Sequence, residues 1–100
     1  MTIAGLDVDA EALADLCRRH QVRRLALFGS RASGEAAPGS DADVLVEFER
    51  GASVGLRFIT VQDELSALLG VPADLCTAGF LSPRFRDRVV REAIPFYEAA

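Results

Sequence analysis

Lysine is absent from this chain, and all eleven of its basic residues are arginine. The absence of lysine excludes a lysine Schiff base, a lysine nucleophile and the lysine of a phosphate-binding P-loop. Long apolar runs are also missing, since none approaches the roughly 20 residues that a membrane-spanning helix needs. We therefore expect no membrane contact and no lysine-dependent chemistry.

Cysteine and histidine are scarce. The two cysteines, Cys17 and Cys76, lie far apart in apolar surroundings. They have neither metal-ligand spacing nor the density of a disulfide scaffold, so they are predicted to be buried free thiols. The only histidine, His20, lies at the end of a predicted helix, where a capping or surface role is favoured over that of a base or ligand. Acids stand near the N-terminus where a signal peptide would carry bases, so a cytoplasmic location is expected.

Positive charge is in deficit, because the formal net charge is −4. A domain that coats nucleic acid gains its affinity by releasing counterions from a basic surface, so direct nucleic-acid binding is not expected. Nucleotide binding stays open, since a divalent cation can screen carboxylates from phosphates. The 100 residues provide one core, so we expect a single domain over 1–100 without a separate substrate domain.

Hydrophobic periodicity predicts a small α/β domain with a short mixed sheet of about three strands flanked by helices. The first helix is expected to be capped by Asp7 or Asp9. Residues 30–40 are predicted to be a loop with one helical turn at its start. The apolar tail at 96–98 either packs back or meets a partner. Predicted strands cover 24–28, 43–48 and 71–76, and predicted helices end near 20, cover 54–69 and extend from 82 to before Pro95.

A Gly-Ser pair directly follows the first predicted strand, in Phe28-Gly29-Ser30-Arg31. Glycine lets the backbone approach a phosphate closely, and the N–H groups of the turn can point at it. The hydroxyl of Ser30 adds one more donor. The alternative is a plain turn, so the pair alone is a weak indication of phosphate binding.

Two carboxylates, Asp41 and Asp43, lie two residues apart where the second predicted strand begins. Alternate strand residues face the same way, so both side chains are expected to project to one side and to bind one hard cation. Without a cation between them, the two charges repel each other. The alternative is an Asp-rich turn in which Asp41 caps its own backbone.

A third acid, Asp74, lies between apolar neighbours in the predicted strand at 71–76. An acid inside a buried strand is costly unless it is paired or bound to metal. The alternative is an edge strand on which Asp74 faces solvent. Combined with a turn that grips phosphate, three carboxylates are the components of a two-metal displacement at phosphorus.

The spacing of these residues resembles that of the DNA polymerase β-type nucleotidyltransferases: Gly29-Ser30, a ten-residue gap, Asp41-x-Asp43 and a later strand acid. More closely, the chain is similar to the minimal nucleotidyltransferases (MNT), the antitoxins of HEPN/MNT toxin–antitoxin systems. This resemblance covers nearly the whole chain and implies the small polymerase β-like nucleotidyltransferase fold. It is carried by FGSRASGEAAPGSDADVLVEF, LLGVPADLC and LSPRFRDRVVREAIPFYE.

The resemblance also implies which residues act. ATP is the expected substrate, and Mg²⁺, as two ions, is the expected cofactor. An acceptor hydroxyl would attack the α-phosphorus in line while pyrophosphate leaves. The residues expected to act in catalysis and to bind the metal are Asp41, Asp43 and Asp74. The residues expected to bind the nucleotide are Gly29, Ser30, Arg31 and Ser40.

Several arginines near these motifs are candidates for contacts with phosphate. Many relatives carry a basic residue where this chain has Ser33, and Arg31 is close enough in sequence to replace that contact. Arg84, Arg88 and Arg91 share one face of the last predicted helix. We interpret this face as solvated, with a contact to triphosphate or to an acidic partner as the alternative.

The resemblance implies an enzyme that transfers AMP from ATP to a hydroxyl, expected to be that of a tyrosine, of a partner HEPN toxin. The two proteins would form a hetero-oligomer in which the toxin's RNase activity is silenced. Two alternatives stay open. One is a weak or inactive binding module that neutralises its partner by covering it, although all five motif residues are retained. The other is a small-molecule nucleotidyltransferase, for which a substrate domain is missing.

Overall fold

A four-stranded mixed sheet, in the order β5-β4-β3-β6, forms the centre of the fold. A computed structural model describes residues 1–37 and 39–100, so Pro38 of the predicted loop lies outside the described residues. The central strands β3 (Val22–Phe28) and β4 (Ala42–Phe48) are antiparallel. On the outer edges, β5 (Ala73–Cys76) runs parallel to β4, and β6 (Ile94–Glu98) runs antiparallel to β3.

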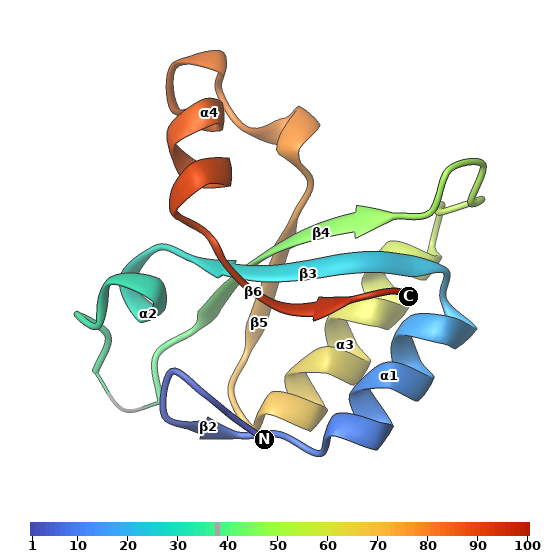
Figure 1. The fold of residues 1–100 in the computed structure, drawn as a ribbon, viewed down its shortest axis with the longest axis horizontal. Helices are drawn as coiled ribbons and strands as arrows, with labels where there is room; N and C mark the ends of the chain where they lie inside the picture. The colour runs from blue at the N-terminus through green and yellow to red at the C-terminus, as the bar shows by residue number, and fades with distance from the viewer. Residues whose placement is uncertain (38) are drawn as a thin grey trace.

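Two helices, α1 (Ala10–Arg19) and α3 (Arg57–Leu69), lie side by side across one face of the sheet (Figure 1). Helix α1 begins where predicted, because a carboxylate oxygen of Asp9 accepts a hydrogen bond from the backbone N–H of Glu11 at 3.0 Å. Helix α3 begins three residues later than predicted and ends at Gly70, whose φ of 77° is the left-handed conformation that glycine adopts without strain.

The main core lies between the sheet and these two helices. Alternate side chains of the two central strands point into it, as expected for strands with one face covered by helices. Burying a leucine or valine side chain stabilises a fold by roughly 1.5–3 kcal/mol, so this interface dominates the stability of the domain. Its most buried side chains, each at most 2% exposed, include Leu25, Leu27, Val44, Val46, Val61 and Leu65.

One carboxylate, Glu64 of α3, joins the two helices. It accepts a hydrogen bond from Arg19 and lies 3.2 Å from Nε2 of His20, at the end of α1. The bond from Arg19 is the main reason why the pKa of Glu64 is lowered. A lowered acid pKa means that this link stabilises the fold at neutral pH and weakens as the pH falls. His20 therefore has a structural role at the helix end.

Helix α4 (Pro83–Glu92) stands apart from the main core. None of its ten described residues is buried, and Figure 1 shows it rising away from α1 and α3. The short 3-10 helix η1 (Ala78–Phe80) links β5 to this segment. Ala93, directly after the C-terminal end of α4, packs on Ala26 and Leu45, on the sheet face opposite the main core. Like every helix in the described part of the chain, α4 lacks the length and apolar character needed to cross a bilayer.

Two parts of the fold differ from the expectation of about three strands. A hairpin of β1 (Thr2–Ile3) and β2 (Leu6–Asp7) precedes α1, and its strands are too short to show a periodicity. The predicted tail is strand β6, so it packs back on the domain. Pro95 is tolerated because β6 is an edge strand, and the backbone groups on its outer side have no neighbouring strand to bond.

Ending the chain at Ala93 would remove β6 and is expected to lower the free energy of unfolding by at least about 3 kcal/mol, because Phe96 and Tyr97 pack against the core. The exposed edge of β3 should also promote self-association. Urea unfolding and light scattering would measure both effects. A chain lacking only Ala100 is the matched control, and equal unfolding midpoints for the two truncations would contradict this role of β6.

Candidate functional site

The Gly29 turn, Asp43 and Asp74 lie at one end of the sheet, where β3 ends and β4 and β5 begin. Phe28, the last residue of β3, pairs with Asp43 of β4. Asp43 in turn pairs with Asp74 of β5. Strand β3 is antiparallel to β4, and β5 is parallel to β4. These chain directions bring the Gly29 turn, Asp43 and Asp74 to the same end of the sheet.

Gly29 is required by its backbone conformation and by its neighbour. Its φ of 72° and ψ of −150° lie in a region that residues with a side chain rarely adopt. A Cβ atom at this position would overlap Oδ2 of Asp43. The carboxylate of Asp43 therefore lies directly against the backbone of the turn. The one-turn helix α2 (Ser30–Ser33) starts at the next residue, with Ser30 exposed.

The half-buried Asp43 carries an electrostatic penalty. Burial raises the pKa of its carboxyl, and the negative charges of Asp74 and Asp41 raise it further. In the described part of the chain, none of these three acids forms a salt bridge with an arginine or with His20. The result is a cluster of uncompensated negative charge, which favours a bound cation.

Carboxylate oxygens and excess negative charge are what a hard divalent cation such as Mg²⁺ requires, so the donor set fits that ion. The three carboxylates do not converge on one point. Among residues 1–37 and 39–100, no three acids, histidines or cysteines are grouped closely enough to hold a metal ion. Asp41 lies immediately before β4, outside the strand. Asp74 is exposed on the edge strand β5, as the alternative interpretation of its position anticipated.

Arg31 contacts the loop that leads to the acids. Its Nε and Nη2 atoms both donate to the carbonyl oxygen of Ser40, at 3.0 and 2.8 Å. The guanidinium thus fixes the residue just before Asp41. The nucleotide-binding roles of Arg31 and Ser40 stay predictions.

A cleft of about 560 Å³ opens beside the Gly29 turn. Helix α4 forms its opposite wall, a position that the sequence did not reveal because it depends on how the chain folds back after β5. Arg88 is the only basic side chain among the described residues that line the cleft, and it is 70% exposed, in agreement with the interpretation of its helix face as solvated. The lining residues are Phe28, Gly29, Ser30, Ala32, Ser33, Glu35, Phe85, Arg88, Val89 and Glu92.

Both cysteines are free, as predicted, but they differ in environment. Cys17 is fully buried in the main core, and burial raises its pKa to about 12. Cys76 is only partly buried. Burial raises the pKa of its thiol, and the charges of Asp74 and Asp43 contribute. Raised thiol pKa values leave little thiolate at neutral pH, so neither cysteine is suited to act as a nucleophile.

Replacing Asp43 with Asn is expected to stabilise the cation-free protein at pH 7. A raised carboxyl pKa means that the fold disfavours the charged form, so a neutral amide should gain on the order of 0.5 kcal/mol, or a few degrees in Tm. This gain should shrink as the pH falls through the pKa of Asp43, because the wild-type carboxyl then becomes neutral as well. Calorimetry without divalent cations would measure it.

The matched control is Asp63→Asn, which neutralises an exposed acid on α3. It should leave the Tm nearly unchanged at every pH. A lower Tm for Asp43→Asn than for wild type at pH 7 would contradict the idea that this site carries uncompensated charge.

Comparison with known proteins agrees with this geometry. Residues 10–96 match the family model described as a nucleotidyltransferase domain. The chain is 40% identical to the protein adenylyltransferase MntA of Thermococcus cleftensis over 80% of each protein.

Solved structures show the same fold. One described as a minimal nucleotidyltransferase has a TM-score of 0.70 and 45% identity, and the match covers 86% of this chain and 87% of that one. A toxin–antitoxin structure with AMP-PNP shares the fold at a TM-score of 0.67 and 20% identity, over 89% of this chain and 73% of that one. The predicted fold is confirmed, and the chain belongs to the nucleotidyltransferase domain family.

Proposed function

We propose that this protein is a Mg²⁺-dependent nucleotidyltransferase that transfers AMP from ATP to a hydroxyl group of a partner protein. The observation that carries the proposal is the contact between the backbone of Gly29 and the carboxylate of Asp43. A turn suited to phosphate and an acid suited to metal are in direct contact there. A metal-bound triphosphate needs both within one short span.

Each part of the site has a role in this reaction. The N–H groups of the turn and the hydroxyl of Ser30 hold the triphosphate. Asp41, Asp43 and Asp74 would hold Mg²⁺, which when bound offsets the negative charge that develops on the phosphate oxygens. The acceptor hydroxyl oxygen bonds to the α-phosphorus, and the bond to pyrophosphate breaks. Asp74 would accept the proton that the hydroxyl loses, and its exposure on the edge strand supports this role.

The accessibility of the site supports a macromolecular acceptor. Asp74 lies on an outer strand rather than at the bottom of a pocket. Two aromatic side chains of the segment after β5 also face solvent, since Phe80 is 79% exposed and Phe85 is 56% exposed. The site is thus open to a hydroxyl presented by another protein.

The comparisons support a more specific partner. The MntA relative is named a protein adenylyltransferase, and a protein of the same fold was solved as a toxin–antitoxin pair with AMP-PNP. We therefore extend the proposal to a tyrosine hydroxyl of a HEPN toxin, with the two proteins forming a hetero-oligomer in the cytoplasm, where ATP is abundant. This chain would then be the antitoxin.

The purified chain, mixed with ATP, Mg²⁺ and the HEPN protein encoded by its neighbouring gene, is expected to increase the mass of that protein by one or more whole AMP units. Asp43→Asn should lower the rate at least about 100-fold, because a metal ligand is lost. Asp63→Asn, which neutralises an exposed acid on α3, should react like wild type. Intact-mass spectrometry would follow the transfer.

Three results would separate the candidate functions. No mass gain with wild type, or equal gain with Asp43→Asn, would overturn the transferase proposal. Neutralisation of the toxin by an Asp41→Ala/Asp43→Ala double variant would favour the binding module. Transfer to a small hydroxyl compound but not to the HEPN protein would favour the small-molecule enzyme.

Gly29→Ala is expected to lower the transfer rate at least about tenfold, because its methyl group must displace the carboxylate of Asp43. Gly34→Ala is the matched control. Gly34 also has a positive φ, of 79°, but a Cβ atom there meets nothing within 4 Å. Gly34→Ala should lose about 1–2 kcal/mol of stability from backbone strain. Gly29→Ala should lose more, because its backbone conformation is essentially restricted to glycine. Equal transfer rates for the two variants would show that the Gly29–Asp43 contact is not needed.

A further inference from the structure

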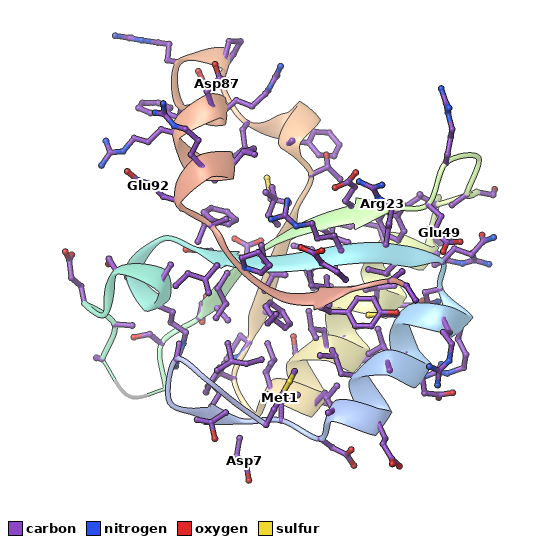
Figure 2. The ribbon with its side chains drawn as sticks, viewed as in Figure 1. Met1, Asp7, Arg23, Glu49, Asp87 and Glu92 are labelled. Atoms are coloured by element: carbon purple, nitrogen blue, oxygen red, sulfur yellow. The ribbon has the colours of Figure 1, made fainter. Side chains whose placement is uncertain are left out.

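Helix α4 presents one stripe of side chains to the cleft beside the Gly29 turn. Phe85, Arg88, Val89 and Glu92 all line the cleft, and their spacing places them on one face of the helix. Figure 2 shows Glu92 on the part of α4 nearest the sheet and Asp87 farther out. The lower half of α4 is therefore one wall of the cleft, and the Gly29 turn is the other.

We propose that Arg88 binds the outer phosphates of the nucleoside triphosphate from this wall, exchanging its contact with Glu92 for contacts with phosphate. This inference rests on the proposed function and adds a binding residue that lies outside the Gly-Ser and Asp motifs. Arg88 contacts the ligand in this arrangement, and Glu92 competes with the ligand for the guanidinium.

The charges that line the cleft require such a residue. Glu35 and Glu92 both line it and would repel a triphosphate, whereas Arg88 is the one basic side chain among the described lining residues. Arg31, the nearest alternative in sequence, is engaged with the carbonyl of Ser40. A guanidinium can form two parallel hydrogen bonds with phosphate oxygens, so Arg88 suits this ligand in shape as well as in charge.

The order of the phosphates follows from where the acids lie. Asp43 contacts Gly29 but does not line the cleft, so the metal-binding side and the cleft lie on either side of the turn. The α-phosphorus must be close to the acids for transfer to occur. The outer phosphates therefore extend past Gly29 toward α4, where Arg88 meets them.

The contact between Arg88 and Glu92 is easily exchanged. Nε of Arg88 lies 3.3 and 3.4 Å from the two carboxylate oxygens of Glu92. Their side chains are 70% and 66% exposed. Exposed pairs four residues apart on a helix are weak, and a more highly charged phosphate competes well for the guanidinium. Glu92 thus competes with the nucleotide, and removing its charge should favour binding.

Binding of AMP-PNP with Mg²⁺ to the full chain, measured by titration calorimetry, tests the proposal. Arg88→Gln is expected to raise the Kd about tenfold, because a charged hydrogen bond to phosphate is lost. Glu92→Gln is expected to lower the Kd about twofold, because the competing carboxylate is gone. Arg84→Gln, on the same helix but away from the cleft lining, is the matched control and should leave the Kd unchanged.

Two further readouts separate ligand binding from helix stabilisation. AMP lacks the outer phosphates, so Arg88→Gln should leave its Kd unchanged. If the pair only stabilises α4, both variants should instead change binding in the same direction and reduce helicity by circular dichroism. That pattern, or wild-type affinity of Arg88→Gln for AMP-PNP, would overturn this proposal and leave AMP transfer untouched. Failure of wild type both to bind AMP-PNP and to transfer AMP would overturn the proposed function as well.

Discussion

The contact between Gly29 and Asp43 depends on the pairing of β3 with β4, and the rest of the site depends on that contact. The two strands are the central pair of the sheet, and their inner side chains form the main core. Their register places Phe28 opposite Asp43, so the turn after β3 cannot move without disturbing buried leucines and valines. Core packing therefore provides the precision that a phosphate site needs, while the turn itself is exposed.

The same arrangement places like charges together. Parallel pairing of β4 with β5 sets Asp43 beside Asp74, and no arginine in the described chain neutralises them by a salt bridge. The raised pKa of Asp43 shows that the fold disfavours its ionised form. A bound cation would remove that penalty. Sites of this kind are less stable than their surroundings until the ligand is present, which is the usual compromise between stability and function.

The local features of this fold were predictable, and the long-range ones were not. Asp9 and Gly70 mark helix ends through local chemistry, and the Gly-Ser turn and the three acids are visible as spacing. Strand β6 was hidden because Pro95 lowers strand propensity and because its partner, β3, lies some 70 residues earlier in the chain. The position of Arg88 beside the cleft was hidden for a similar reason. The sequence shows a basic helix face, but not that the chain after β5 brings α4 opposite the Gly29 turn.

The contacts of the other arginines show why Arg88 is the residue proposed to bind the nucleotide. Arg19, Arg23 and Arg24 each pair with a glutamate, and Arg31 is held by a backbone carbonyl. Of the arginines in the described part of the chain, Arg88 alone lines the cleft beside the Gly29 turn. On the proposed function, the cation between the acids and this arginine both contribute to the affinity for the nucleotide. Arg88 can exchange partners because its contact with Glu92 is exposed to solvent.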